Sequence, residues 1–544
     1  MRRRVLLSLA VLGVAAGLFA AAGSGWPAQT RGGTLRISGI GDIDYVDPAL
    51  ADTIASWMFQ FAICAKLYSF PDKPAPEGLT VVPEVAAGFP KASRDAKTFT
   101  IELKRTYRFH TGAPITAANF VAAFERDAGP NLRSRAAGYV RDFVGAVAFI
   151  EGKADRITGV KALGPYTLQL RATRPLHDLS ARLTMPFFCP IAVDTPQQQI
   201  ENPLGSGPYY IDSRVPNRQT VLKRNPFYRG PRPANVDRIV FSVGLGQEAC
   251  REAVERNEED WCVHVPTDDY PELADRYGIN RPNGRFFFNR TVETDFFVFN
   301  HERPAFIDAG RVPLEKAINL VIDRPDLVRG AGHLGARRTD QILPPDTLGR
   351  DEQIYPLRGV SEEVVARARS LLARTEKPEK LVLYASNCSC RPGVARAQSF
   401  KYALGRLGID VEIKYFSYSE FIRRVETRGE PFDVADWAWA PDYPDGLAYL
   451  GQLLHGRLIT ASANSNVTYL DSPKVNREID RIDSLVGQAR RRAWADLDVE
   501  LMRNDPPWAP YANDAEVDFV SKSLGCYVLQ PVIGRIDLAA ACKK

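Results

Sequence analysis

The chain has 544 residues, too many for one ordinary hydrophobic core, so its length favours two or three lobes. Its hydrophobic content of 45% is that of an ordinary globular protein. Lys and Arg number 70 against 65 Asp and Glu, a near balance that excludes the basic surface expected for nucleic-acid binding.

The first residues have the pattern of a signal peptide. Three arginines at positions 2–4 precede an uncharged apolar run from Val5 to about Ala22, followed by small residues. We expect residues 1–28 to be cleaved on export, which lowers the formal charge from +5 to +2. The alternative is an uncleaved anchor, because the 19 residues from Val5 to Gly23 could just span a bilayer. The run does not end in a cysteine for lipid attachment, which favours a free periplasmic protein.

The first half of the mature chain mixes strand-like runs with helical patches. Expected strands cover residues 32–38, 98–104, 166–170, 220–225 and 237–243, and expected helices cover 53–68 and 116–127. We assign residues 29–290 to a first lobe of mixed α/β structure.

The second half is more regular. After a strand at 295–300 and helices at 312–328 and 361–374, three strands at 380–386, 411–418 and 432–439 alternate with helices at 393–408 and 420–429. This alternation predicts a parallel sheet with right-handed crossovers. We assign residues 291–505 to a second lobe and 506–544 to a return into the first.

The chain would cross between the lobes twice, near residues 285–294 and 506–513. Two crossings place a cleft between the lobes, where hinge closure around ligands operates. Ligands of such sheets lie beyond the carboxyl ends of the strands. The loops at 387–393 and 440–446 are therefore candidate ligand-binding loops.

Catalytic signatures are absent from the sequence. It has no Gly-x-Ser-x-Gly elbow, no His-Glu-x-x-His, no phosphate-binding loop and no dinucleotide fingerprint. Its six histidines do not have metal-ligand spacing. We therefore predict a protein that is not an enzyme, with no cofactor and no metal.

The eight cysteines suggest disulfides in an oxidising compartment. Four bonds can be connected in about 105 ways, so each pairing is a hypothesis. We predict bonds joining Cys250 with Cys262, Cys526 with Cys542, and Cys64 with Cys189. The Cys-Ser-Cys triplet at Cys388 and Cys390 is left open, because two thiolates alone cannot complete a zinc site.

The segment 432–450 contains the main candidate site. Trp439 and Tyr443 flank Asp442 directly beyond a predicted parallel strand, so a carboxylate with aromatic neighbours could project into the cleft. Such a group suits a cationic ligand such as an α-ammonium. The alternative is structural: Trp437 and Trp439 face the core while Asp442 opens a turn.

Several segments in order resemble the family 5 extracellular solute-binding proteins of ABC importers. They are RGGTLRI, YVDPALADT, FHTGAPITAANF, NPLGSGPYYI, FNHERPAFIDAGRVPLEKAINLVIDRPDLV and AWAPDYPDGLAYL. The resemblance covers nearly the whole mature chain. It implies an α/β, two-lobed periplasmic-binding-protein fold of type II, with an extra subdomain in the first lobe.

The resemblance also implies a function and a site. Peptide-binding members pair an aspartate of a Trp-x-x-Asp-Tyr pattern with the ligand's free amino terminus, and Asp442 occupies that position here. Tyr45, in YVDPALADT, and Asn387, at the start of the 387–393 loop, are further candidate ligand-binding residues. Gly446 departs from the family, where proline is common.

The expected function is capture of a peptide-like solute in the periplasm by a monomer that delivers it to membrane-embedded ABC importer subunits, without nucleic acid. A non-peptide solute (oligosaccharide, opine or metal chelate) and a chaperone or sensory role remain alternatives.

Overall fold

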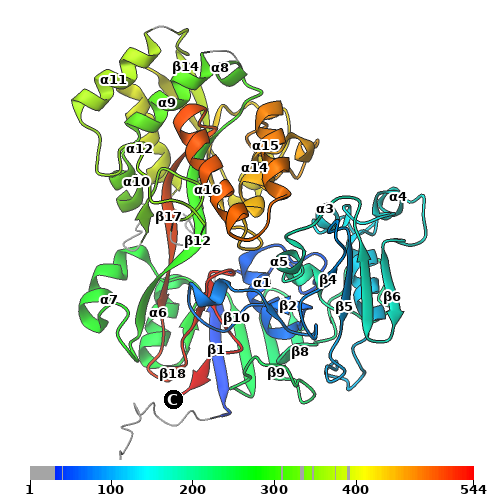
Figure 1. The fold of residues 1–544 in the computed structure, drawn as a ribbon. Helices are drawn as coiled ribbons and strands as arrows, with labels where there is room; N and C mark the ends of the chain where they lie inside the picture. Colours follow the sequence, from blue (N-terminus) through cyan, green and yellow to red (C-terminus); the bar gives the residue numbers. More distant parts are fainter. Residues whose placement is uncertain are drawn as a thin grey trace, which may run out of the picture.

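The structure is a computed structural model that describes residues 31–39, 41–307, 310–330, 336–345, 348–373, 375–388 and 393–544. The predicted signal segment lies outside these ranges. Two lobes, one above the other in Figure 1, are joined by the long strands β12 (Phe286–Phe299) and β17 (Trp508–Phe519). The expected boundaries of the lobes at residues 290 and 505 fall inside β12 and just before β17. Among the described residues no helix is long and apolar enough to cross a membrane.

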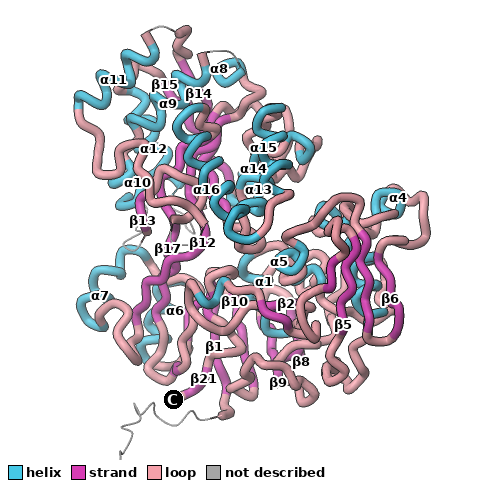
Figure 2. The backbone as a smooth tube through the Cα atoms, viewed as in Figure 1, coloured by secondary structure: helices cyan, strands magenta, loops and turns pink. Residues whose placement is uncertain are grey.

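The first lobe contains two main sheets. One has the order β11(Trp261–Cys262)-β1(Thr34–Gly39)-β10(Arg238–Val243)-β9(Gln219–Arg224)-β8(Tyr209–Val215). The other, at the right of Figure 2, is antiparallel with the order β4(Lys91–Ala92)-β5(Thr98–Glu102)-β7(Thr167–Arg171)-β6(Val160–Gly164). Its buried side chains belong to a hydrophobic cluster that also includes Trp57, Val532 and, from the second lobe, Tyr443.

Seven helices of the described first lobe cover these sheets or link them. They are α1 (Ile54–Ile63), α2 (Ala117–Asp127), α3 (Ala137–Val140), α4 (Ala146–Ile150), α5 (Leu179–Arg182), α6 (Gln247–Arg256) and α7 (Tyr270–Tyr277). Small antiparallel pairs are formed by β2 (Tyr68–Ser69) with β3 (Val82–Pro83), by β18 (Leu524–Gly525) with β21 (Cys542–Lys543), and by β19 (Leu529–Gln530) with β20 (Arg535–Ile536).

The second lobe is built on a mixed sheet. Its order is β13(Arg337–Arg338)-β17-β12-β16(Val434–Trp439)-β14(Lys380–Ser386)-β15(Asp410–Phe416). Strand β14 is parallel to both β15 and β16, as the alternating pattern predicts, while β12 runs antiparallel to β16. The carboxyl ends of β14 and β16 therefore lie at one edge of the sheet.

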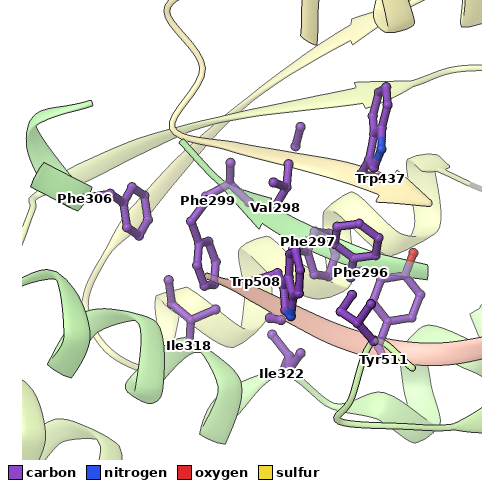
Figure 3. Packing of buried hydrophobic residues seen from close by; sticks show 14 of the residues in the cluster. Phe296, Phe297, Val298, Phe299, Phe306, Ile318, Ile322, Trp437, Trp508 and Tyr511 are labelled. Carbon is purple, nitrogen blue, oxygen red and sulfur yellow. The ribbon is translucent and has the colours of Figure 1, made fainter. Parts of the chain in front are cut away.

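Helices pack on both faces of this sheet. They are α8 (Pro304–Ile307), α9 (Arg311–Val321), α10 (Arg324–Gly330), α11 (Glu362–Leu372), α12 (Gly393–Gly405), α13 (Tyr418–Val425), α14 (Leu450–Leu454), α15 (Pro473–Asp483) and α16 (Gly487–Asn504). Figure 3 shows Phe299 directed toward Ile318 of α9, while Trp437 projects from β16 away from α9. The continuous aromatic run in β12 is explained by this burial on both faces.

The prediction of a single helix over residues 312–328 is wrong. The chain forms α9 and α10 instead, with extended backbone at Ile322 between them. Asp323 accepts a hydrogen bond from the Asp326 amide at 3.1 Å, so it caps a new helix start. Pro325 fits the first turn of that new helix, where an N–H is not needed.

All three predicted disulfides are formed. Cys64 is bonded to Cys189, Cys250 to Cys262, and Cys526 to Cys542, with Cα–Cα distances of 5.8, 6.0 and 5.4 Å. Cys388 is also disulfide-bonded, and Cys390 lies outside the described residues.

Candidate functional site

The loop that carries Asp442 follows β16 and is held from both sides. The Tyr443 hydroxyl donates to Asp178 of the first lobe at 2.7 Å, and the Tyr443 side chain is fully buried. On the other side, Asp445 accepts two hydrogen bonds from Arg490 of α16, at 2.8 and 2.9 Å. Asp442 is therefore fixed where the two lobes meet.

The Asp442 carboxylate faces the first lobe and accepts a hydrogen bond from the Tyr139 hydroxyl of α3. It does not cap the following turn, because the Leu447 amide donates to Asp445 at 2.9 Å. Within the described part of the chain, no backbone amide donates to Asp442. The alternative in which Asp442 merely opens a turn thus has little support from the geometry.

Arg135 lies between two further carboxylates near Asp442. Its guanidinium is 2.9 Å from Asp52 of the first lobe and 3.0 Å from Glu426 of the second. Asp44 adds another negative charge, because it accepts a hydrogen bond from the Asp52 amide at 2.9 Å. Asp52, Glu426 and Asp442 therefore share one guanidinium at the lobe boundary.

The pKa values in this group reflect burial and a shortage of positive charge. Burial raises the pKa of Asp442 to about 6; Asp52 adds to this, while Tyr139 and Arg135 oppose it. Burial also raises the pKa of Glu426, with Arg135 opposing. The pKa of Asp52 is raised in the same way, but its side chain is 39% exposed, so the case for a cation rests on Asp442 and Glu426. A bound cation would favour the ionised form of all three.

The other predicted site residues are placed differently. Trp439 is half-buried at the end of β16 and its indole N–H donates to the Ala448 carbonyl at 2.7 Å. Tyr443 is buried away from solvent, so we infer that it anchors the loop instead of contacting ligand. Tyr45 is 38% exposed beside Asp44. Asn387 is exposed just beyond β14, at the same sheet edge as the Asp442 loop.

Local packing explains why glycine occupies position 446. A Cβ built on Gly446 would lie 2.2 Å from Cγ of Trp494 in α16. Trp494 is buried, so its ring cannot give way. A proline at this position would meet the same obstacle.

Sequence reasoning missed Asp52, Arg135, Tyr139 and Glu426. These residues lie in loops or short helices, and Asp52, Arg135 and Tyr139 are 303 or more positions from Asp442 along the chain. The available signal was compositional: Asp44 directly precedes the YVDPALADT segment, and Asp52 lies within it.

An alternating chain of ion pairs also crosses between the lobes. Arg182 pairs with Asp178 and with Asp142. The Arg174 guanidinium lies 2.8 Å from the Asp142 carboxylate and 2.5 Å from the Asp483 carboxylate of the second lobe. Asp483 in turn accepts from Arg490 at 3.0 Å. The two ends of this series of ion pairs, Asp178 and Arg490, are the residues that hold the Asp442 loop.

This arrangement defines a two-lobed binding protein with a polar, acidic site at the lobe boundary. Among the described residues, no group of His, Cys, Asp or Glu side chains is arranged to hold a metal ion. The profile of the bacterial extracellular solute-binding proteins, family 5 (middle region), matches residues 80–460. The chain belongs to this family.

Curated relatives are similar along most of their length. The chain is 24% identical to the periplasmic murein peptide-binding protein MppA of Escherichia coli, over 79% of each chain. It is 25% identical to the periplasmic oligopeptide-binding protein OppA of the same organism, over 74% of each chain.

Solved structures share the fold. An oligopeptide-binding protein 2 of clavulanic acid biosynthesis superposes with a TM-score of 0.84 at 23% identity, over 95% of this chain and 96% of the other. DppA of Helicobacter pylori, in complex with the peptide STSA, gives a TM-score of 0.74 at 18% identity, over 94% and 98%.

Proposed function

We propose that the protein captures a peptide-like solute with a free amino terminus in the periplasm and delivers it to the membrane subunits of an ABC importer. It acts as a monomer, as a carrier that does not change its ligand chemically. The division into lobes at residues 290 and 505 belongs to this proposal, since closure of the two lobes would enclose the ligand.

The observation that supports it is the environment of Asp442. The carboxylate is half-buried between the lobes and has a phenol hydroxyl as its hydrogen-bond donor. Further carboxylates around it outnumber Arg135. An α-ammonium would supply the missing positive charge and up to three donors. The named peptide-binding relatives agree with this ligand class.

The test compares ligands that differ only at the amine. Any co-purified ligand is first removed by denaturing and refolding the protein. Calorimetric titration should then show that trialanine binds and that N-acetyl-trialanine does not. Mass spectrometry of the recovered peptide should find it intact. Equal affinity for both peptides, or cleavage of trialanine, would overturn the proposal.

A broader screen covers the remaining ligand classes. Native mass spectrometry of the protein purified without refolding identifies what it carries from the host. A peptide with a free amino terminus supports the proposal. An opine, an oligosaccharide or a metal chelate bound in its place contradicts the ligand class while leaving the carrier role intact.

A further inference from the structure

The carboxylates at the lobe boundary exceed the positive charge that the protein supplies to them. Asp52, Glu426 and Asp442 share the Arg135 guanidinium. Within the described part of the chain, Arg135 is the one cation that lowers the pKa of any of the three. When all three carboxylates are ionised, two negative charges therefore remain without a partner.

The α-ammonium of the proposed ligand accounts for one of these charges, at Asp442. The other charge belongs to Asp52 and Glu426, which lie on either side of Arg135. Burial raises the pKa of both side chains, and the single guanidinium opposes this shift at both. A second cation from the ligand would favour the ionised form of the pair.

These side chains are open to a ligand. The Asp52 and Arg135 side chains are 39% and 44% exposed, and that of Glu426 is 10% exposed. Arg135 binds Oδ2 of Asp52, which leaves Oδ1 for a ligand donor. Asp44 is occupied differently, because it accepts from the Asp52 and Thr53 amides at the start of α1, where the helix dipole offsets its charge.

We propose that the site selects a ligand with two positive charges, namely a peptide whose first residue has a basic side chain. This inference rests on the proposed function, because the α-ammonium has to be held at Asp442. The side-chain cation would lie beside Asp52 and Glu426 and donate charge-assisted hydrogen bonds to them. It would then contact both lobes, since Asp52 belongs to the first and Glu426 to the second. The whole chain has a formal charge of +5, so the attraction has to come from this local group and not from the overall field of the protein.

The test is calorimetric titration with Lys-Ala-Ala and Nle-Ala-Ala, two peptides that differ only in the side-chain cation, since Nle is norleucine. Wild type should bind Lys-Ala-Ala about 10-fold more tightly. Combining Asp52→Asn with Glu426→Gln keeps the shapes of both side chains and should abolish this preference. The loss should be confined to Lys-Ala-Ala. Asp410→Asn is the control and should keep the full preference, because Asp410 is 63% exposed at the start of β15.

A second pair of peptides tests the position of the charge. Ala-Ala-Lys and Ala-Ala-Nle carry the same difference at the third residue and should bind wild type equally. Equal binding of Lys-Ala-Ala and Nle-Ala-Ala, or the same preference at the third residue, overturns the inference and leaves the proposed function standing. Loss of Nle-Ala-Ala binding in the double variant also overturns it, because the two carboxylates would then support the structure of the site.

Failure of the proposed function gives a different result. If no peptide with a free amine binds, or if acetylation of the amine has no effect, the proposed function fails and this inference falls with it. 1,5-Diaminopentane has both positive charges without a peptide bond. If it binds as tightly as Lys-Ala-Ala, the second cation is supported and a peptide as the ligand class is overturned.

Discussion

Asp442→Asn separates a ligand-binding role for this residue from a structural one. The asparagine keeps the shape of the side chain and can still accept from Tyr139, but it removes the charge. A ligand ammonium enclosed between the lobes would then be buried without its partner, at a cost of about 3–5 kcal/mol. Affinity for a free-amine peptide should fall by roughly 100-fold or more.

The same substitution should make the unliganded protein more stable. In the folded chain the pKa of Asp442 is raised from 3.8 to about 6, so its ionised form destabilises the fold above pH 6. About two pKa units correspond to at most about 3 kcal/mol, and partial exposure reduces this to about 1–2 kcal/mol. Asp442→Asn should therefore stabilise the unliganded protein by about that amount at pH 7.5. This gain in stability should fade as the pH falls from 6 toward 4. Asp442 of the folded wild-type protein then becomes protonated and no longer carries the destabilising charge.

The assay combines calorimetric titration with trialanine and chemical denaturation of the unliganded proteins at pH 7.5 and 4.5. Asp410→Asn is the matched control, because Asp410 is exposed at the opposite end of the same sheet, at the start of β15. Unchanged affinity in Asp442→Asn would refute the assignment of the ammonium partner. A loss of unliganded stability at pH 7.5 would instead indicate a structural role.

Further predictions concern pH, lobe closure, the disulfides and the packing of the loop. Below about pH 6, protonation of Asp442 should weaken peptide binding by up to about 10-fold per pH unit in wild type, measured by titration across pH 7 to 5; a flat profile contradicts the raised pKa. Small-angle scattering should give a smaller radius of gyration with peptide than without, because closure places both lobes on the ligand, and identical profiles at saturation would argue for a preformed site. Replacing Cys250 and Cys262 together by alanine should lower the free energy of unfolding by about 3 kcal/mol for a loop of that length, measured against the oxidised wild type; an unchanged denaturation midpoint would contradict it. Gly446→Ala should destabilise the second lobe by about 1–3 kcal/mol, because its methyl group meets Trp494, and an unchanged melting curve would show that the loop can shift.

Much of the fold could be predicted from the sequence because its signals are local. The alternation between residues 380 and 439 follows side-chain periodicity, and the structure confirms the parallel pairing of β14 with β15 and β16. The split between α9 and α10 was missed, since the apolar periodicity continues through Ile322 while the capping by Asp323 competes with it. The position of Asp442 beyond β16 was predicted correctly from strand order.

The sequence by itself determined most of the elements and the loop that presents Asp442, because side-chain periodicity along the chain controls these. The disulfide pairings were hypotheses among many connectivities, and the fold placed the paired cysteines together. Only the tertiary structure decided what surrounds that carboxylate. Tyr139 and Arg135 come from the first lobe and Glu426 from the second, and no periodicity links residues so far apart. Their meeting depends on how β12 and β17 carry the chain between lobes. The burial of Tyr443 is likewise a consequence of that packing, since its hydroxyl binds an aspartate 265 positions away.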